Sequence, residues 1–168
     1  MAIKYRNYSY LGTVQDSIKH YMNTAGEAGG IVCHVNTESF TSDMDDPADI
    51  VGYVASPVTG TTRVAGLLMF DVLDYDPTKV ERNFQNPFEV PITSKVWVVT
   101  SGTFETNMIT PADVAGLTGP APAYLGANGL LTTEPDDGEA TPTDHIRVGR
   151  FESGVDSDGY VMFTVDFT

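Results

Sequence analysis

The chain has 168 residues, of which 41% are hydrophobic and 19% charged, the composition of a single globular domain. Its 23 acidic residues outnumber its 9 Lys and Arg residues, giving a formal net charge of −14. Phosphate contacts require clustered Lys and Arg, so we expect no binding to nucleic acid or to an anionic membrane. One cysteine excludes an internal disulfide.

The first 22 residues differ in charge from the rest of the chain. They carry a segment charge of +2, whereas the remaining residues carry −16. The segment is also rich in tyrosine, and Tyr and Arg are enriched at protein interfaces. It is interpreted either as an arm that docks on a partner or as an edge strand whose tyrosines cover the core. The contact residues of such an arm would be Lys4, Tyr5, Arg6, Tyr8 and Tyr10.

The next segment is predicted to be a short helix. Thr13 with Asp16 resembles a capping box, and apolar residues follow at helical spacing up to Met22. The Gly-rich stretch Asn23 to Gly30 is predicted to be a linker. We therefore divide the chain into an N-terminal arm and helix, residues 1–23, and a β-rich domain, residues 24–168.

The rest of the chain is predicted to be strands, because β-branched and aromatic residues recur between turn formers. The last segment alternates apolar with polar residues and should have one buried face. Val64 to Phe70 and Val96 to Val99 are continuously apolar and should be central strands covered on both faces. The predicted strands are 31–35, 50–55, 63–73, 95–101, 145–151 and 160–167.

Turn dipeptides between these segments indicate hairpins. They are Thr59-Gly60, Ser101-Gly102, Asn128-Gly129 and Asp158-Gly159. Thr110-Pro111 predicts one helical turn ending at Gly116. The expected fold is all-β, an antiparallel β-sandwich or barrel of jelly-roll type with the short N-terminal arm and helix.

No catalytic motif is present, and we expect a non-enzymatic protein without a cofactor. Cys33 lies beside His34, but neighbouring residues of a strand point to opposite faces, so Cys33 is predicted to be a core residue. The N-terminal residues contain no apolar stretch of the kind found in a secretory signal, and no apolar run is long enough to span a bilayer, which needs about 20 residues, so a soluble cytoplasmic product is expected.

Acidic loops raise the question of calcium, which prefers oxygen ligands. Asp43, Asp45, Asp46 and Asp49 lie within one short stretch. Pro47 breaks the spacing of an EF-hand, and solubilising charge is the preferred interpretation. These four residues remain weak candidates for a structural cation, and no metal site is predicted.

The order of the strand segments resembles that of head decoration, or cement, proteins of tailed bacteriophages. The resemblance covers about residues 24 to 167. It rests on Ala28 to Val32, Val64 to Leu73, Lys95 to Val98, Tyr124 to Thr132, Ile146 to Phe151 and Val161 to Val165. In that family a "G-x-L-T" segment precedes a strand reading roughly "I-x-V-G-R-F" and a final hydrophobic strand.

The resemblance implies a structural virion protein, made in the host cytoplasm, that binds the outer surface of an icosahedral capsid. Its partners would be the major capsid protein and further copies of itself, as a dimer or trimer. An acidic body suits the capsid exterior, and a basic, aromatic arm suits an acidic shell.

Two other classes stay open. One is a virion fibre or lectin-like module that recognises a host surface or glycan. The position of Trp97, the only tryptophan, within an apolar run argues against this class. The other is a small β-fold hydrolase with an acid pair such as Glu81 and Glu89.

Overall fold

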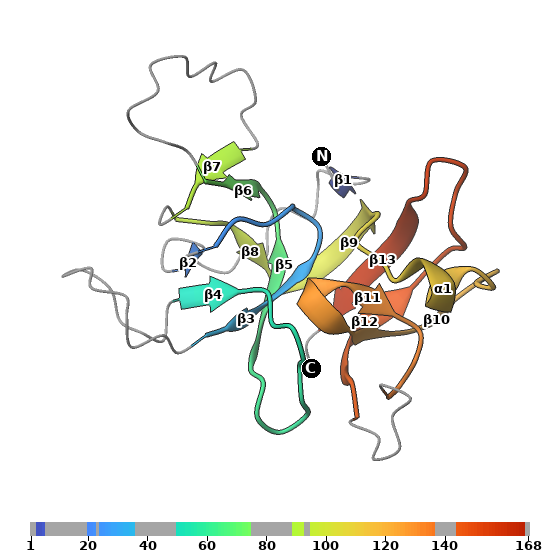
Figure 1. The fold of residues 1–168 in the computed structure, drawn as a ribbon. Coiled ribbons are helices and arrows are strands. Elements are labelled where there is room, and N and C mark those ends of the chain that lie inside the picture. Colours follow the sequence, from blue (N-terminus) through green and yellow to red (C-terminus); the bar gives the residue numbers. More distant parts are fainter. Residues whose placement is uncertain are drawn as a thin grey trace.

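The computed structural model describes residues 3–5, 20–22, 24–35, 50–74, 89–92, 95–136 and 144–166, and residues 3–5 by their backbone. Within these ranges the protein is almost entirely β-structure: two curled sheets, each forming half of a barrel, lie side by side (Figure 1). The strands pair mainly antiparallel. The predicted all-β, antiparallel fold class is confirmed.

The six-stranded sheet contains the C-terminal strands, and every pair in it is antiparallel. Its order is β1-β9-β13-β12-β10-β11. The strands are β1 (Ile3–Tyr5), β9 (Ser101–Thr106), β10 (Ala121–Leu125), β11 (Leu131–Thr132), β12 (Ile146–Phe151) and β13 (Val161–Asp166).

The five-stranded sheet has the order β2-β4-β3-β5-β8. Its strands are β2 (Tyr21–Met22), β3 (Ile31–His34), β4 (Ile50–Gly52), β5 (Val64–Leu68) and β8 (Val98–Val99). A third, two-stranded parallel sheet pairs β6 (Asp71–Leu73) with β7 (Glu89–Pro91). The helical elements are α1 (Pro111–Val114), which begins with proline as predicted, and the 3-10 turn Ala127–Gly129.

Two apolar clusters hold the sheets. The central core lies between the two large sheets and includes Cys33 and Leu67 from one and Phe151 and Phe163 from the other. The outer core lies on the opposite face of the five-stranded sheet, where Val32 and Leu68 pack with Val72 of β6. The five-stranded sheet is therefore buried on both faces, because successive residues of β3 and of β5 enter different cores.

Most predicted strands are present. Segments 31–35, 50–55, 145–151 and 160–167 contain β3, β4, β12 and β13. In β13 the residues Val161, Phe163 and Val165 are buried, as the alternation predicts. Segment 63–73 forms two strands, since the chain leaves β5 at Met69 and enters the third sheet at Asp71. Three of the four turn dipeptides are turns with the glycine at positive φ: Gly60, Gly129 and Gly159. The last two connect hairpins, β10-β11 and β12-β13, whereas the turn at Gly60 joins β4 and β5, which have β3 between them.

Three predictions are wrong. The C-terminal end of the predicted helix is a strand, because Tyr21 and Met22 pair with Ile50 and Val51 of β4; residues 13–19 lie outside the described residues. The predicted linker is packed within the fold, with residues 28–30 buried. Ser101-Gly102 is not a turn but the start of β9, where Gly102 pairs with Val165. The proposed domain boundary at residue 23 thus falls between two strands of one sheet.

The segment around Trp97 also differs from expectation. β8 lies at the edge of its sheet, and although Val98 and Val99 are buried, Trp97 is 46% exposed. The apolar run fits burial on both faces at β8 but not at Trp97, which precedes the strand.

Candidate functional site

The N-terminal candidates are only partly within the described residues. Lys4 and Tyr5 lie on β1, at the edge of the six-stranded sheet, opposite Glu105 and Phe104 of β9 in the register. This backbone position is that of an edge strand. Arg6, Tyr8 and Tyr10 lie outside the described residues, as do Asp43, Asp45, Asp46 and Asp49. The docking role stays a prediction, and the four aspartates stay weak candidates for a cation.

The structure brings two arginines of β12 to one face of the six-stranded sheet. Arg147 and Arg150 are three positions apart, and in a regular strand they would point to opposite faces. Between them the register with β10 shifts, because Ala123 pairs with Gly149 while Tyr124 pairs with Arg147. Such a bulge inserts one extra residue, so the side chains of Arg147 and Arg150 lie on the same face of the sheet. Both arginines are exposed and line the same pocket.

Gly149 makes this bulge possible. Its φ is +155°, and a Cβ atom at this position would clash with the backbone carbonyl oxygen of Thr164 on the neighbouring strand. Only glycine therefore fits where β12 and β13 approach each other.

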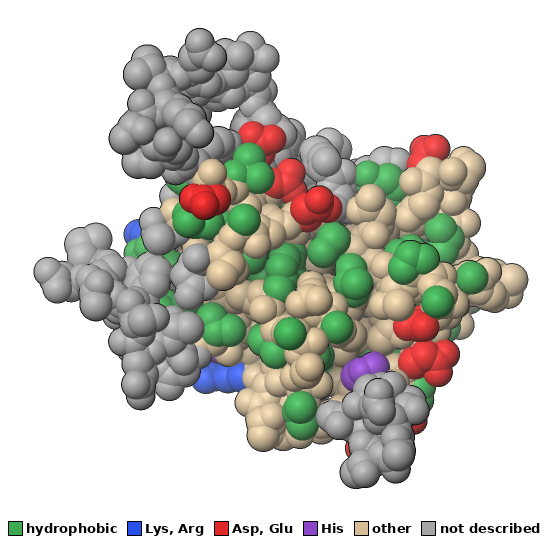
Figure 2. Space-filling model, in the orientation of Figure 1, with side chains coloured by type: hydrophobic (Ala, Val, Ile, Leu, Met, Phe, Trp, Pro, Cys, Tyr) green, Lys and Arg blue, Asp and Glu red, His purple; other side chains and the backbone are tan. Residues whose placement is uncertain are grey.

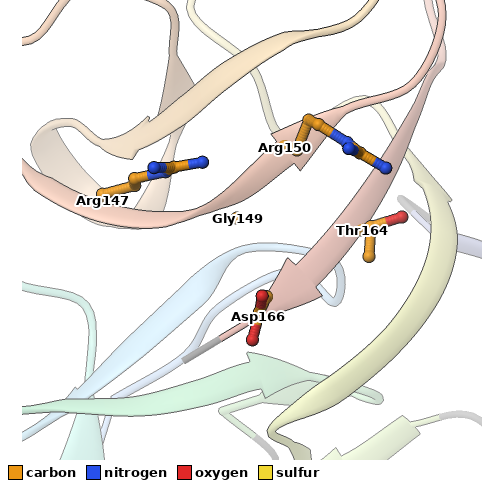
Figure 3. Close-up of a pocket in the computed structure, with 5 residues that line it drawn as sticks. All are labelled: Arg147, Gly149, Arg150, Thr164 and Asp166. Atoms are coloured by element: carbon orange, nitrogen blue, oxygen red, sulfur yellow. The ribbon is translucent and has the colours of Figure 1, made fainter. Parts of the chain in front are cut away.

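The pocket at the bulge has a volume of about 340 Å³. Figure 3 shows Gly149 between the two arginines on one strand, with Thr164 and Asp166 on the next. Two cations, a hydroxyl and a carboxylate thus line one hollow of the sheet face. This arrangement can bind charged side chains of a partner.

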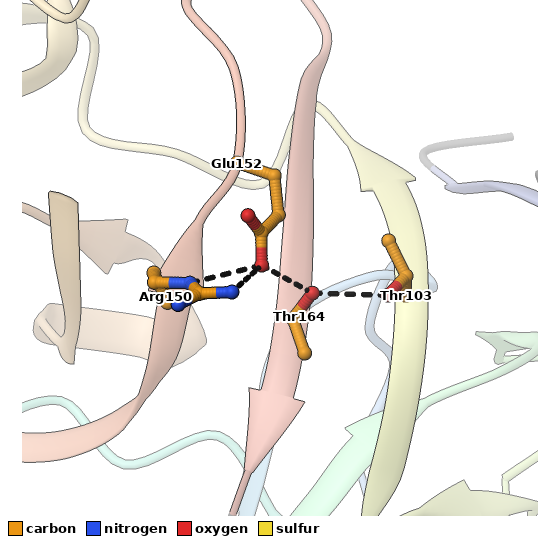
Figure 4. A network of polar contacts seen from close by, with 4 residues as sticks. All are labelled: Thr103, Arg150, Glu152 and Thr164. Atoms are coloured by element: carbon orange, nitrogen blue, oxygen red, sulfur yellow. Dashed lines mark hydrogen bonds and ion pairs between the residues drawn. The ribbon is translucent and has the colours of Figure 1, made fainter. Parts of the chain in front are cut away.

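Arg150 is already held within the chain. Its Nε and Nη2 atoms donate to Oε1 of Glu152, at 3.0 and 2.7 Å. The Thr164 hydroxyl donates to the same oxygen at 2.9 Å, and it lies 2.9 Å from the Thr103 hydroxyl of β9. Figure 4 shows this network crossing three strands. It fixes the side chains of the exposed face.

The Arg150 contacts determine the charge of Glu152. Burial alone would raise the pKa of the Glu152 carboxyl, but hydrogen bonds from Arg150 and Thr164 and the Arg150 charge outweigh it. The pKa of Glu152 is therefore lowered, and the carboxylate is ionised at neutral pH.

A second groove, of about 550 Å³, lies between β6 and the segment before Ala28. It contains the carboxylates of Glu27 and Asp71, and Asp71 accepts a hydrogen bond of 2.7 Å from the Ala28 backbone N–H. Acidic side chains show at the upper edge of the face seen in Figure 2. For the hydrolase alternative, Glu89 lies on β7, whereas Glu81 lies outside the described residues. Within the described ranges no three His, Cys, Asp or Glu side chains gather to hold a metal ion.

Cys33 is a core residue, as predicted. Its side chain is fully buried in the central core, and burial raises the pKa of its thiol to about 12. A thiol with so high a pKa is protonated at neutral pH and is a poor nucleophile.

Trp97 forms an aromatic pair at the surface. Its ring lies edge-on to Phe70, with 5.8 Å between the ring centroids. Phe70 packs against the central core, so the exposed indole is supported by a fixed neighbour. An exposed aromatic ring of this kind can stack on a ligand or fill a partner's pocket.

The sequence analysis did not identify Arg147, Arg150, Glu152 or Asp166 as site residues. One signal was present: no Lys or Arg occurs between Val96 and Ile146, and two arginines then follow within four positions. The bulge that places them on one face could not be read from the sequence, because Gly149 also fits a regular strand.

Comparisons with known proteins give no relative for this chain. No family model, no curated protein and no solved structure matches it. No helix in the described part of the chain has the length and apolar character needed to cross a membrane.

Proposed function

We propose that this protein is a structural virion protein of the head decoration type. It would bind the outer surface of an icosahedral phage capsid and cement neighbouring major capsid proteins, a role that requires no catalytic chemistry and no cofactor.

The observation that carries the proposal is that the C-terminal segments on which the resemblance rests form strands of the six-stranded sheet. Ile146 to Phe151 is β12, and the closing segment is β13; together they form the centre of the six-stranded sheet. The "G-x-L-T" segment, Gly129 to Thr132, ends in β11 at the edge of the same sheet. The resemblance therefore rests on segments that form the sheet.

Charge and topology are compatible with attachment from outside. The basic N-terminal segment begins at β1, an edge strand of an otherwise acidic molecule. An edge strand can join or leave a sheet without disturbing its centre. A protein that binds only the assembled shell stabilises it by mass action.

The test is co-sedimentation with particles. A native lysate is separated on a density gradient, and the chain is followed by mass spectrometry. We expect it to migrate with intact heads at high copy number, and particles stripped of it to lose heat resistance. A chain that stays at the top of the gradient as a free protein would overturn the proposal.

The role of the arm is tested on the same gradient. Removing residues 1–12 should leave the body folded but weaken or abolish attachment, and the Lys4→Gln, Arg6→Gln double variant should weaken it more at low salt than at high salt, where the charges are screened. Lys95→Gln removes one exposed cation elsewhere and serves as the control. An unfolded deletion variant would instead show that β1 is required for the core.

The exposed Trp97 favours a second candidate, a virion module that binds a glycan or host surface. Trp97 is the only tryptophan, so its fluorescence reports directly on ligand stacking. Titration with a panel of glycans should shift the emission of the parent if this candidate holds. Spectra that do not change across the panel would remove it.

A further inference from the structure

Arg147 and Asp166 are oppositely charged neighbours that do not pair with each other. They lie on adjacent strands, β12 and β13, and line the same pocket. Both side chains are exposed. Among the described residues neither side chain makes an ion pair or a hydrogen bond, whereas the nearby Arg150 is bound to Glu152.

This arrangement is unusual for so acidic a chain. With 23 acidic residues against 9 basic ones, each arginine has many carboxylates available as neighbours. Arg147 nevertheless makes no ion pair with a carboxylate of the described residues, although Asp166 lines the same pocket. The sheet fixes the backbone of Arg147, so only the side chain has to be ordered when a carboxylate arrives from outside.

We propose that this face of the six-stranded sheet is a two-fold interface between two copies of the chain. Arg147 of each copy contacts Asp166 of the other. In a two-fold dimer the same patch is used twice, so a patch must be complementary to itself. A cation and an anion placed side by side, unpaired within the chain, meet this requirement.

The pocket gives the contact its shape. Its hollow of about 340 Å³ over Gly149 can receive a side chain of the second copy, and the Thr103, Thr164, Arg150 and Glu152 network keeps the surrounding surface fixed. An exposed ion pair contributes little by itself, but the symmetry makes two of them and the contact excludes water from both.

The inference does not depend on the capsid proposal. A chain that dimerises through this face but never migrates with particles would retain the interface and lose the capsid role. A chain that migrates with particles, but whose self-association does not change when Arg147 or Asp166 is substituted, would retain the capsid role and lose the interface.

The experiment uses two charge reversals, Arg147→Asp and Asp166→Arg, with Arg63→Asp as a control at an exposed cation just before β5. Masses are measured by sedimentation equilibrium. The parent and the control should be dimers. Each reversal alone places like charges opposite each other and should raise the dimer dissociation constant by roughly tenfold or more.

Mixing the two reversed variants gives the decisive result. In a mixed dimer both contacts again join opposite charges, so an equimolar mixture should recover the dimer mass although neither variant does so alone. Pairing within one chain would not be restored by mixing.

A monomeric or trimeric parent, single variants that keep the parent's dissociation constant, or a mixture that stays monomeric would each overturn the proposal. Circular dichroism melts check that the variants are folded, and Arg147→Ala with Asp166→Asn provides a milder pair if a reversal unfolds.

Discussion

The five-stranded sheet is apolar on both faces, whereas the six-stranded sheet has one apolar and one polar face. In β5, Leu67 enters the central core and Leu68 enters the outer core. In β13, Phe163 enters the central core while Thr164 faces the charged pocket. The outer core is closed by β6 and β7, and no comparable layer covers the network of Figure 4 in the described part of the chain.

This difference separates the structural from the recognition part of the molecule. A sheet covered on both sides has no face left to offer to a partner. The six-stranded sheet presents fixed polar side chains on a rigid support, the arrangement expected of a binding surface. The following predictions test this division, from the largest effect to the smallest.

Leu68→Ser should have the largest effect. Leu68 is fully buried on the outer side of β5, so the substitution leaves a cavity and buries a hydroxyl. We expect a loss of about 4 kcal/mol in the free energy of unfolding, measured by urea denaturation. Met162→Ser is the matched control: Met162 is half-buried on the polar face of β13 and should cost about 1 kcal/mol or less. Equal losses would show that the two faces do not differ as described.

Gly149→Ala should come next, because it attacks the bulge that forms the polar face. The new methyl group would clash with the Thr164 backbone, and the loss should be about 3 kcal/mol. Gly60→Ala is the control for backbone conformation alone, since Gly60 also has a positive φ but open space around it, and it should cost about 1 kcal/mol. If both variants lose the same amount, packing at the bulge is not tight.

The same division explains how much of the molecule could be predicted from the sequence. The alternation in β13 and the apolar run of β5 were interpreted correctly. A strand buried on one face alternates apolar and polar residues, and a strand buried on both faces is continuously apolar. The strand β9 was missed because Ser101-Gly102 has the composition of a turn, and its pairing with Val165 depends on a strand about 60 residues away in the chain.

The candidate site could be predicted less well than the fold. Its four charged residues come from β12, β13 and the residue after β12, and only the register brings them together. The exposure of Trp97 could not be predicted either, because three valines around it are buried and the run as a whole is apolar.

Glu152→Gln should have a moderate effect that depends on pH. The folded-state pKa of Glu152 is lowered, so its contribution to stability is present above the ordinary value of 4.5 and is lost as the pH falls through the folded-state pKa. At pH 7 the variant should lose about 1 kcal/mol, measured by thermal or urea unfolding. The difference from the parent should shrink in acid. A difference that is constant from pH 7 to strongly acidic conditions would mean that the carboxylate charge is not involved.

Trp97→Ala should have the smallest effect on stability, below about 1 kcal/mol, because the side chain is nearly half exposed and loses mainly its edge-on contact with Phe70. The parent should show red-shifted emission that acrylamide quenches readily, since water reaches the ring. Val98→Ala, one position further along the chain, is the control, because Val98 is buried in the outer core and should cost about 2 kcal/mol. A large loss at Trp97 together with blue, protected emission would place the ring in the core, and the aromatic pair would then belong to the structural half of the molecule rather than to its surface.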